Sequence, residues 1–181
     1  MLIRAEQSCL LVVDIQGKLV PAVDDNQALI THSKWLIEVA AILDIPTLTS
    51  EQYPKGLGGT IEELDQLLPA EGKMDKVYFS CAADGDCLTK IESVNRQQII
   101  IIGMEAHVCV MQTAFGLKDC GKEVYVVADA VGSRNPLDKE LALTRMREYG
   151  IHVVSREMVA FEWMEKSGTD AFRKISSDYL R

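Results

Sequence analysis

Cys109 is the residue whose type and position most directly suggest chemistry. It follows the isoleucine run 99–102 and Gly103, and such a run is typical of a buried parallel strand. Reactive groups in open α/β sheets commonly lie where a strand gives way to the next helix. A thiol at a helix N-terminus has its pKa lowered by the free N–H groups, which favours the nucleophilic thiolate. Cys109 is therefore a candidate nucleophile. The alternative is that it is a small apolar residue filling the helix–sheet interface.

Asp14 and Lys76 could complete a site around this thiol. Asp14 ends the apolar run 8–13, and Lys76 opens the apolar run 77–79. A carboxylate can orient or deprotonate a thiol, and an ammonium group stabilises a thiolate and developing negative charge. A nucleophile, a base and a cation are sufficient for acyl transfer through a thioester. Taken alone, each has a plainer interpretation: a solvated strand-end or capping carboxylate for Asp14, and an exposed strand-end charge for Lys76.

The apolar pattern that must position these residues predicts strands alternating with helices. Strands are expected at residues 8–13, 46–49, 77–79, 98–102, 123–128 and 151–154. Helices are expected at residues 26–43, 86–94, 108–118, 136–149, 157–166 and 169–177. This order predicts an α/β fold of three layers, α/β/α. Its central sheet is expected to be doubly wound, mostly parallel and six-stranded.

Substrate contacts are expected outside the carboxyl ends of the strands. The Gly- and Pro-rich segment 50–59 predicts an irregular loop there, so its Gln52 and Tyr53 are candidate pocket residues. Gln16, just after the first strand, could reach the pocket mouth or contact a loop. Thr60 is expected to cap a short helix together with Glu63.

The remaining polar residues near these strand ends are expected to have structural roles. Asp129, at the end of the fifth strand, is expected to form structural hydrogen bonds, with Arg134 as its partner or as a contact for a substrate anion. His107 is expected to pack or to make a polar contact beneath the Cys109 turn. His32 and His152 are isolated in the sequence and are interpreted as structural or surface residues.

Length and composition limit the classes of protein. The 181 residues predict one domain, residues 1–181, because domains commonly have about 100–200 residues. With 19 Lys and Arg against 27 Asp and Glu, the net charge is 19 − 27 = −8, which predicts no nucleic-acid partner. No segment approaches the roughly 20 apolar residues that span a bilayer, so no membrane partner is expected. The residues 1–6 lack a secretion signal, and five cysteines without a C-x-x-C pair indicate reduced thiols in the cytoplasm.

Together these motifs resemble the isochorismatase-like cysteine hydrolase superfamily, which includes nicotinamidases and N-carbamoylsarcosine amidases. The resemblance covers essentially the whole chain. It rests on Asp14 after its apolar strand, on Lys76 with residues 79–80, on the segment 103–110 that contains Cys109, and on Asp129 within 128–131. Each piece alone is weak, but the combination is specific.

The resemblance implies a mechanism. In it Asp14 takes the thiol proton, Lys76 balances charge, and Cys109 attacks a carbonyl to give a thioester that water hydrolyses. It further implies an oxyanion hole from the backbone N–H groups of Glu105 and Cys109, and a non-proline cis peptide bond between Met104 and Glu105. Family members also assemble as homo-oligomers, so a dimer or a larger assembly is expected.

Two departures from the family pattern narrow the expected chemistry. Metal-binding nicotinamidases carry an Asp-x-His pair and a further His after the second strand, whereas the segment 50–58 contains no His and offers only Glu51. A tight divalent site needs several converging ligands, so no metal and no cofactor are expected. Isochorismate-cleaving relatives do not need a nucleophilic Cys, and the presence of Cys109 therefore favours C–N or acyl chemistry.

The chain thus resembles a metal-independent subgroup of isochorismatase-domain proteins of unknown substrate. The predicted function is hydrolysis of a C–N bond in a small amide or related carbonyl compound through a Cys109 thioester. One alternative is a vinyl-ether hydrolase that uses Asp14 as the acid. The other is a catalytically degenerate oligomeric binding protein.

Overall fold

A six-stranded, all-parallel sheet forms the centre of the molecule. The computed structural model describes residues 1–180. The strand order is β3-β2-β1-β4-β5-β6, and every neighbouring pair is parallel. The strands are β1 (Ser8–Val13), β2 (Thr47–Gln52), β3 (Lys73–Lys76), β4 (Gln98–Met104), β5 (Glu123–Gly132) and β6 (His152–Val154). The predicted doubly wound α/β fold is confirmed, and its order reverses between β1 and β4.

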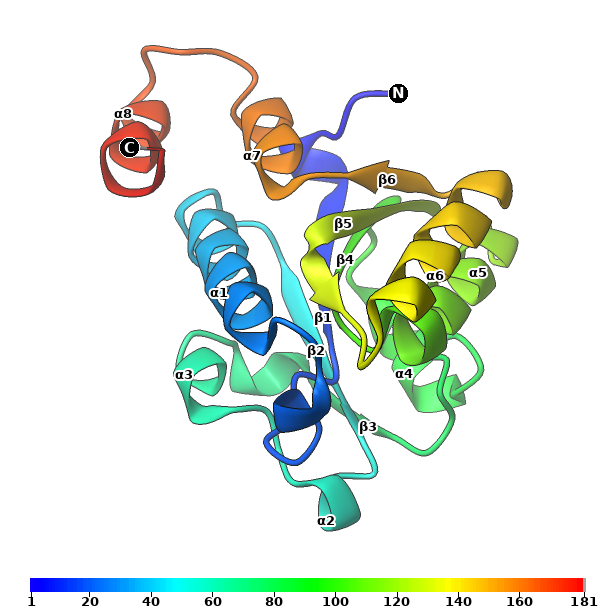
Figure 1. Cartoon of the computed structure of the whole chain (residues 1–181). Coiled ribbons are helices and arrows are strands. Elements are labelled where there is room, and N and C mark those ends of the chain that lie inside the picture. Colours follow the sequence, from blue (N-terminus) through cyan, green and yellow to red (C-terminus); the bar gives the residue numbers. More distant parts are fainter. Residues whose placement is uncertain (181) are drawn as a thin grey trace.

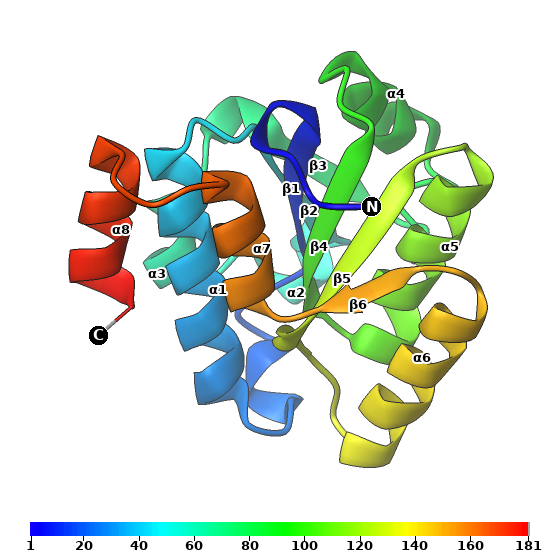
Figure 2. The ribbon, with the colours of Figure 1, turned by 90° about the horizontal axis from the view of Figure 1, so that it is seen from above.

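Helices cover both faces of this sheet (Figure 1). Seen from above, α1, α7 and α8 lie on one side and α4, α5 and α6 on the other (Figure 2). The helices are α1 (Asn26–Ile42), α2 (Pro54–Leu57), α3 (Glu62–Asp65), α4 (Gly85–Ser93), α5 (Met111–Asp119), α6 (Pro136–Glu148), α7 (Arg156–Met164) and α8 (Asp170–Tyr179). A π-helical turn, Ala106–Val110, leads into α5, and short 3-10 turns occupy Ala5–Gln7, Val20–Ala22 and Ala70–Gly72.

The two central strands are buried along their whole length. Every residue of β1 and β4 is buried, because a parallel strand covered by helices on both faces has no solvent side. Along β1, Leu10 and Val12 pack on the side of α1, while Leu11 and Val13 pack on the side of α5. This anchoring fixes the carboxyl ends of β1 and β4 side by side, with Val13 opposite Gly103.

The third strand lies earlier than its apolar residues suggested. The prediction of a strand at residues 77–79 was wrong, since β3 is Lys73–Lys76 and Lys76 ends it rather than opening it. Within β3, Met74 and Lys76 are buried, and Lys76 pairs in register with Gln52. Residues 77–79 are of types that favour strands, but they are more than half exposed and do not pack against the core.

Three further segments differ from the expected limits. β2 continues to Gln52 because its outer edge pairs with β3, so the loop begins later than expected. β5 continues to Gly132 past an irregularity in its pairing with β4, which places Asp129 inside the strand rather than at its end. Thr60 does not cap α3, whose N-cap is Ile61.

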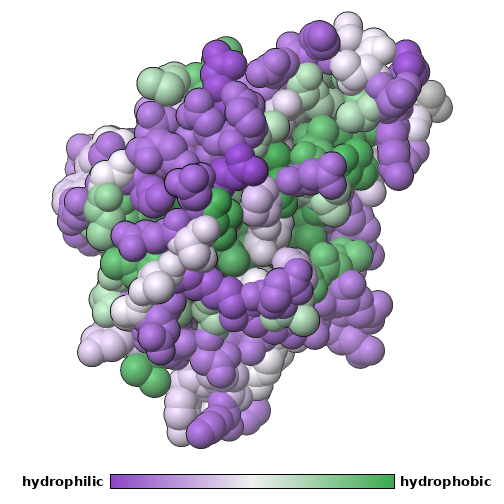
Figure 3. Space-filling model, turned by 180° about the vertical axis from the view of Figure 1, so that it is seen from behind, coloured by the Kyte–Doolittle hydropathy of each residue, from purple (hydrophilic) through white to green (hydrophobic). Residues whose placement is uncertain are grey.

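The face opposite to the view of Figure 1 is predominantly polar. From behind, hydrophilic side chains dominate, and apolar ones show mainly in recessed places between them (Figure 3). Within residues 1–180, no helix combines the length and apolar character needed to cross a bilayer.

Candidate active site

Asp14 and Lys76 form a buried ion pair at the carboxyl edge of the sheet. Asp14 follows β1 in a left-handed conformation, with φ of 53°, which turns the chain at the strand end. Its Oδ2 lies 2.8 Å from the Nζ of Lys76, and its Oδ1 accepts a 2.7 Å hydrogen bond from the hydroxyl of Ser50. The two carboxylate oxygens therefore have one donor from β3 and one from β2.

Cys109 lies on the same side of the sheet as this pair. It is in the π-helical turn after β4, is 7% exposed, and lies close enough to Asp14 and Lys76 for both charges to influence its thiol. Gly103 permits the close approach of β4 to β1, because a Cβ at this position would lie 2.0 Å from the carbonyl oxygen of Val13. The structure thus brings together the three residues that the sequence nominated.

The turn between β4 and Cys109 leaves the backbone N–H of Glu105 available. The peptide bond between Met104 and Glu105 is cis, as expected from the family resemblance. The Glu105 carbonyl accepts hydrogen bonds from the N–H groups of Val108 and Val110 but not from that of Cys109, and within residues 1–180 the Glu105 N–H has no acceptor. The Glu105 N–H thus points to no acceptor within the described chain, and the Cys109 N–H does not bond to the Glu105 carbonyl.

Burial dominates the protonation of the thiol and of its base. Burial raises the pKa of Cys109, and the Asp14 carboxylate raises it further, while Lys76 lowers it. The net shift of the Cys109 pKa is therefore upward, against the expectation that a helix N-terminus lowers it. Burial also raises the pKa of Asp14, against the opposing effects of Lys76, Ser50 and Cys109.

Lys76 remains the cation of the site. Burial lowers the pKa of Lys76, but the negative charge of Asp14, together with Cys109 and Cys81, outweighs it, and the net shift is upward. The arrangement is thus a protonated thiol beside a carboxylate that an ammonium group holds in place. In this arrangement the thiol proton can pass to Asp14 as the sulfur attacks an electrophile.

Gln16 and Gln52 lie beneath this site rather than at its mouth. Gln16 is fully buried, and its side-chain amide bonds to the backbone of Gln52 and to the Gly58 carbonyl. The side chain of Gln52 accepts a 2.6 Å hydrogen bond from Lys76 and donates one to the Val77 carbonyl. These contacts favour a supporting role for both glutamines over direct substrate contact.

Of the three expected pocket residues, Gln16, Gln52 and Tyr53, only Tyr53 is exposed to solvent. It is 55% exposed and lines, with Asp75 and Val77, a pocket of about 270 Å³ along the edge strand β3. It remains a candidate contact for the substrate.

Comparison with known proteins assigns the family. The isochorismatase domain model matches residues 8–158, which include Asp14, Lys76 and Cys109. The chain belongs to the isochorismatase family. Isochorismatase domain-containing protein 2 of Danio rerio is 35% identical over 170 residues, covering 93% of this chain and 84% of that protein.

Solved isochorismatase-like structures share the fold. A structure described as the MAR1 ribonuclease from Caenorhabditis elegans has a TM-score of 0.91 and 35% identity, and the alignment covers 100% of this chain and 93% of that one. The YcaC gene product of Escherichia coli, described as an octameric hydrolase of unknown specificity, has a TM-score of 0.92. At 22% identity, over 99% of this chain and 91% of that one, it supports the fold alone.

In this isochorismatase-family chain the loop after β2 is fastened by Glu51. One carboxylate oxygen of Glu51 accepts 2.7 Å hydrogen bonds from both the N–H and the hydroxyl of Thr60. Thr60 therefore anchors the loop to β2 instead of capping α3. Across residues 1–180, no group of three or more His, Cys, Asp or Glu side chains is placed to hold a metal ion.

The polar residues flanking the isochorismatase-type site mostly have structural partners. Asp129 bonds the backbone N–H and the guanidinium of Arg156 at the start of α7, which confirms its structural role. Arg134 is not its partner, since the guanidinium pairs with Glu105 at 2.7 Å. His107 contacts the hydroxyl of Ser133 at 3.0 Å, the polar contact expected of it.

The other two histidines are also accounted for. The Nδ1 of His32 lies 2.6 Å from the Asp129 carbonyl oxygen. The exposed His152 stacks on Tyr125, with ring centroids 4.7 Å apart.

Ser50 is the site residue that sequence reasoning missed. It was assigned to the irregular loop, whereas it lies in β2 opposite Val13 and is fully buried. Recognising it requires the extent of β2, because only the strand register places its hydroxyl against Asp14.

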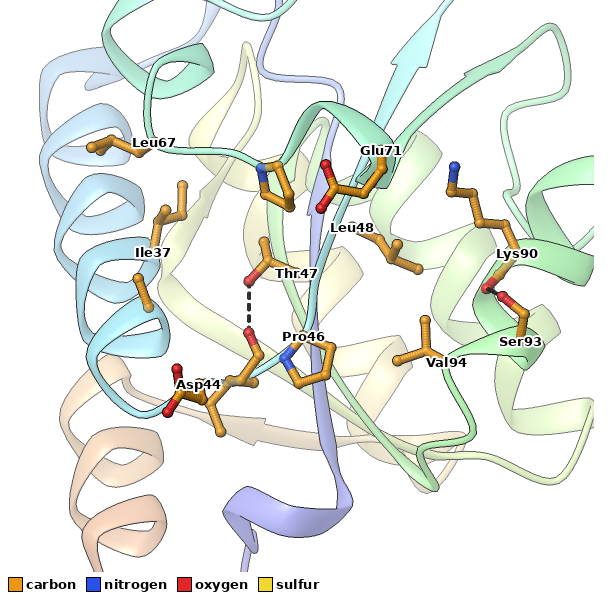
Figure 4. Close-up of a pocket in the computed structure, with 14 residues that line it drawn as sticks. Ile37, Asp44, Pro46, Thr47, Leu48, Leu67, Glu71, Lys90, Ser93 and Val94 are labelled. Carbon is orange, nitrogen blue, oxygen red and sulfur yellow. Dashed lines mark hydrogen bonds between the residues drawn. The ribbon is translucent and has the colours of Figure 1, made fainter.

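A separate cavity lies at the other end of the sheet. It has a volume of about 580 Å³ and surrounds the amino end of β2, where Pro46, Thr47 and Leu48 face Ile37 of α1 and Val94 after α4 (Figure 4). Because this end of β2 is opposite to the end that carries Ser50, the cavity does not belong to the candidate active site.

Proposed function

We propose that this isochorismatase-family hydrolase cleaves the C–N bond of a small amide or related carbonyl compound through a thioester on Cys109. The observation that carries the proposal is the buried Asp14 carboxylate, with the Lys76 ammonium 2.8 Å from one oxygen and the Cys109 thiol close enough for both charges to influence it. A base, a cation and a nucleophile held together out of water are the components of covalent acyl transfer.

The proposed reaction has two stages. As the Cys109 sulfur bonds to the substrate carbonyl carbon, its proton passes to Asp14, and the oxyanion accepts hydrogen bonds from the N–H groups of Glu105 and Cys109. Asp14 then gives the proton to the leaving nitrogen as the C–N bond breaks. In the second stage water attacks the thioester carbon and Asp14 accepts one water proton. As the C–S bond breaks, Asp14 gives this proton to the sulfur, which restores the thiol, and the acid product leaves. Lys76 balances the negative charge of the site throughout.

Intact-mass analysis during turnover tests this proposal. We expect a panel of small amides to include substrates that leave an acyl adduct on Cys109 after rapid acid quenching. Cys109→Ala should lose both adduct and turnover, whereas Cys120→Ala, which alters the exposed cysteine, should retain them. Substantial turnover by Cys109→Ala would instead support vinyl-ether hydrolysis with Asp14 as the acid. Ligand binding without turnover or adduct would support a degenerate binding protein.

RNA cleavage is the competing activity suggested by the relative described as a ribonuclease. Against it, this chain has a net charge of −8, and RNA binding depends on a basic surface that neutralises phosphates. We therefore propose a small-molecule substrate. Incubation with labelled RNA under the conditions of the amide panel checks this, since RNA cleavage that is lost in Cys109→Ala would contradict the choice.

The assembly and location are also proposals. All five cysteines are free, which agrees with a reducing cytoplasm, and a structure of the same fold is described as octameric. We propose a cytoplasmic homo-oligomer. Light scattering during size-exclusion chromatography measures its mass directly.

A further inference from the structure

We infer that Gln52 is a positioning residue that holds the Lys76 ammonium against Asp14, and that Gln16 acts through Gln52. This inference rests on the proposed function, in which Lys76 is the cation of the site. It replaces the interpretation of the two glutamines as substrate contacts.

The first step of the argument is the coordination of Lys76. Its Nζ donates to Asp14 Oδ2 at 2.8 Å and to Gln52 Oε1 at 2.6 Å, and its side chain is fully buried. A lysine ammonium is a point charge on a flexible four-carbon stem, so one acceptor alone does not fix its position. Two acceptors that converge from β1 and β2 do so.

The orientation of the Gln52 amide is itself determined. Its Nε2 donates a 2.8 Å hydrogen bond to the Val77 carbonyl, directly after Lys76. Reversing the amide would place an NH₂ group against the ammonium and an oxygen against a carbonyl, so both contacts would be repulsive. Gln52 therefore presents its oxygen to Lys76, and both ends of its amide are occupied within the protein.

The side-chain amide of Gln16 hydrogen-bonds to the backbone of Gln52 as a residue of a neighbouring strand would. The Gln52 N–H donates to Gln16 Oε1 at 2.7 Å, and Gln16 Nε2 donates to the Gln52 carbonyl at 2.9 Å. β1 ends at Val13, and the left-handed turn at Asp14 takes its backbone out of the ladder. The buried Gln16 amide satisfies the backbone groups that β1 no longer reaches.

The consequence is electrostatic. Lys76 lowers the pKa of the Cys109 thiol. When the Gln52 oxygen is lost, the ammonium has a single fixed acceptor, its charged form is less stabilised, and its mean position moves away from the thiol. We therefore expect a lower pKa for Lys76 and a smaller thiolate fraction at Cys109.

The test compares Gln52→Met and Gln16→Met with Gln98→Met. Gln98 is a fully buried, hydrogen-bonded glutamine at the amino end of β4, far from Cys109, and so is a matched control for stability. Two readouts are used across pH: the rate of Cys109 alkylation by iodoacetamide, followed by peptide mapping, and the titration of the ¹⁵N-labelled Lys76 amine by NMR.

Gln52→Met should slow Cys109 alkylation about tenfold at fixed pH and lower the Lys76 titration by about one pH unit, the shift expected from losing one hydrogen bond to a charged group. Gln16→Met should also slow Cys109 alkylation and lower the Lys76 titration, each by a smaller amount. Gln98→Met should lower the thermal midpoint and change neither readout. If Gln52→Met behaves like Gln98→Met, Gln52 is merely structural and the inference is wrong.

A second variant covers loss of folding in Gln52→Met. Gln52→Glu has the same size, but its carboxylate competes with Asp14 for Lys76 and adds negative charge near the thiol, so alkylation should slow more than tenfold. An unchanged rate in a folded Gln52→Glu protein would also overturn the inference. The titration of Lys76 needs no substrate, so it stays decisive even if no amide is hydrolysed and the proposed function fails.

Discussion

Lys76 Nζ lies 2.8 Å from Asp14 Oδ2, and neither side chain has any exposed surface. Removing two such charges from water costs several kcal/mol for each ion, which their mutual attraction repays only with good geometry and further hydrogen bonds. Here Ser50 and Gln52 supply those additional bonds. A completely buried pair beside a thiol is more readily explained by chemistry than by stability.

The charges around Cys109 should control its reactivity in opposite directions. Asp14 raises and Lys76 lowers the pKa of this thiol. Asp14→Asn should therefore speed iodoacetamide labelling of Cys109 at pH 8, and Lys76→Met should slow it, each by about tenfold or more. Peptide mapping measures both rates, with the exposed Cys120 as the reference in each protein. Faster labelling in Lys76→Met would contradict this electrostatic description.

Lys76→Met should destabilise the protein in a pH-dependent way. At pH 7.5 it leaves the Asp14 carboxylate buried and unpaired, a change that typically costs about 3–5 kcal/mol. Burial already raises the pKa of Asp14, and losing Lys76 raises it further. The folded variant therefore takes up a proton that the unfolded chain binds only near pH 4, so its stability should increase as the pH falls through the folded pKa.

Urea unfolding at pH 7.5 and pH 5 measures this change. The difference between wild type and Lys76→Met should narrow at the lower pH. Asp14→Asn combined with Lys76→Met removes both charges and should recover part of the loss at pH 7.5. A difference that stays constant with pH would show that Asp14 does not titrate in the folded variant.

Gly103→Ala should be severely destabilising. The new Cβ would lie 2.0 Å from the Val13 carbonyl oxygen, and the residue has φ of 121°. We expect a loss of more than about 3 kcal/mol in the free energy of unfolding, because backbone of β1 or β4 must shift. Gly121→Ala is the control, since it also has positive φ but no atom within 4 Å, and should cost only about 1–2 kcal/mol. Equal losses would contradict the steric explanation.

Thr60→Val should loosen the loop after β2. The substitution keeps the shape of the side chain but removes the hydroxyl that bonds to Glu51. We expect about 1–2 kcal/mol of destabilisation and faster proteolysis within residues 53–60. Thr31→Val, on the exposed surface of α1, should change neither the free energy of unfolding nor the rate of proteolysis within residues 53–60. Unaltered proteolysis in Thr60→Val would show that the Glu51 contact does not restrain the loop.

The sequence by itself determined the fold and three residues of the candidate site. Continuous apolar strands such as β1 and β4 identify a parallel sheet, and the residues after such strands meet at one edge whatever the details. Asp14 follows β1 directly and Cys109 lies in the turn after β4, so topology brings both to this edge. Lys76 was nominated by its position beside an apolar run and by its charge, and the family resemblance supplied the cis peptide bond at Glu105.

Only the tertiary structure decided the limits of the outer strands and the partners of the polar residues. Val77 has a strong strand propensity, but a strand also needs a neighbour, and β2 offers one only as far as Gln52, opposite Lys76. Ser50 and Gln16 acquire their roles through hydrogen bonds to residues 36 positions away. The pKa of Cys109 likewise depends on burial, which outweighs the helix terminus and is a property of the packed molecule rather than of local sequence.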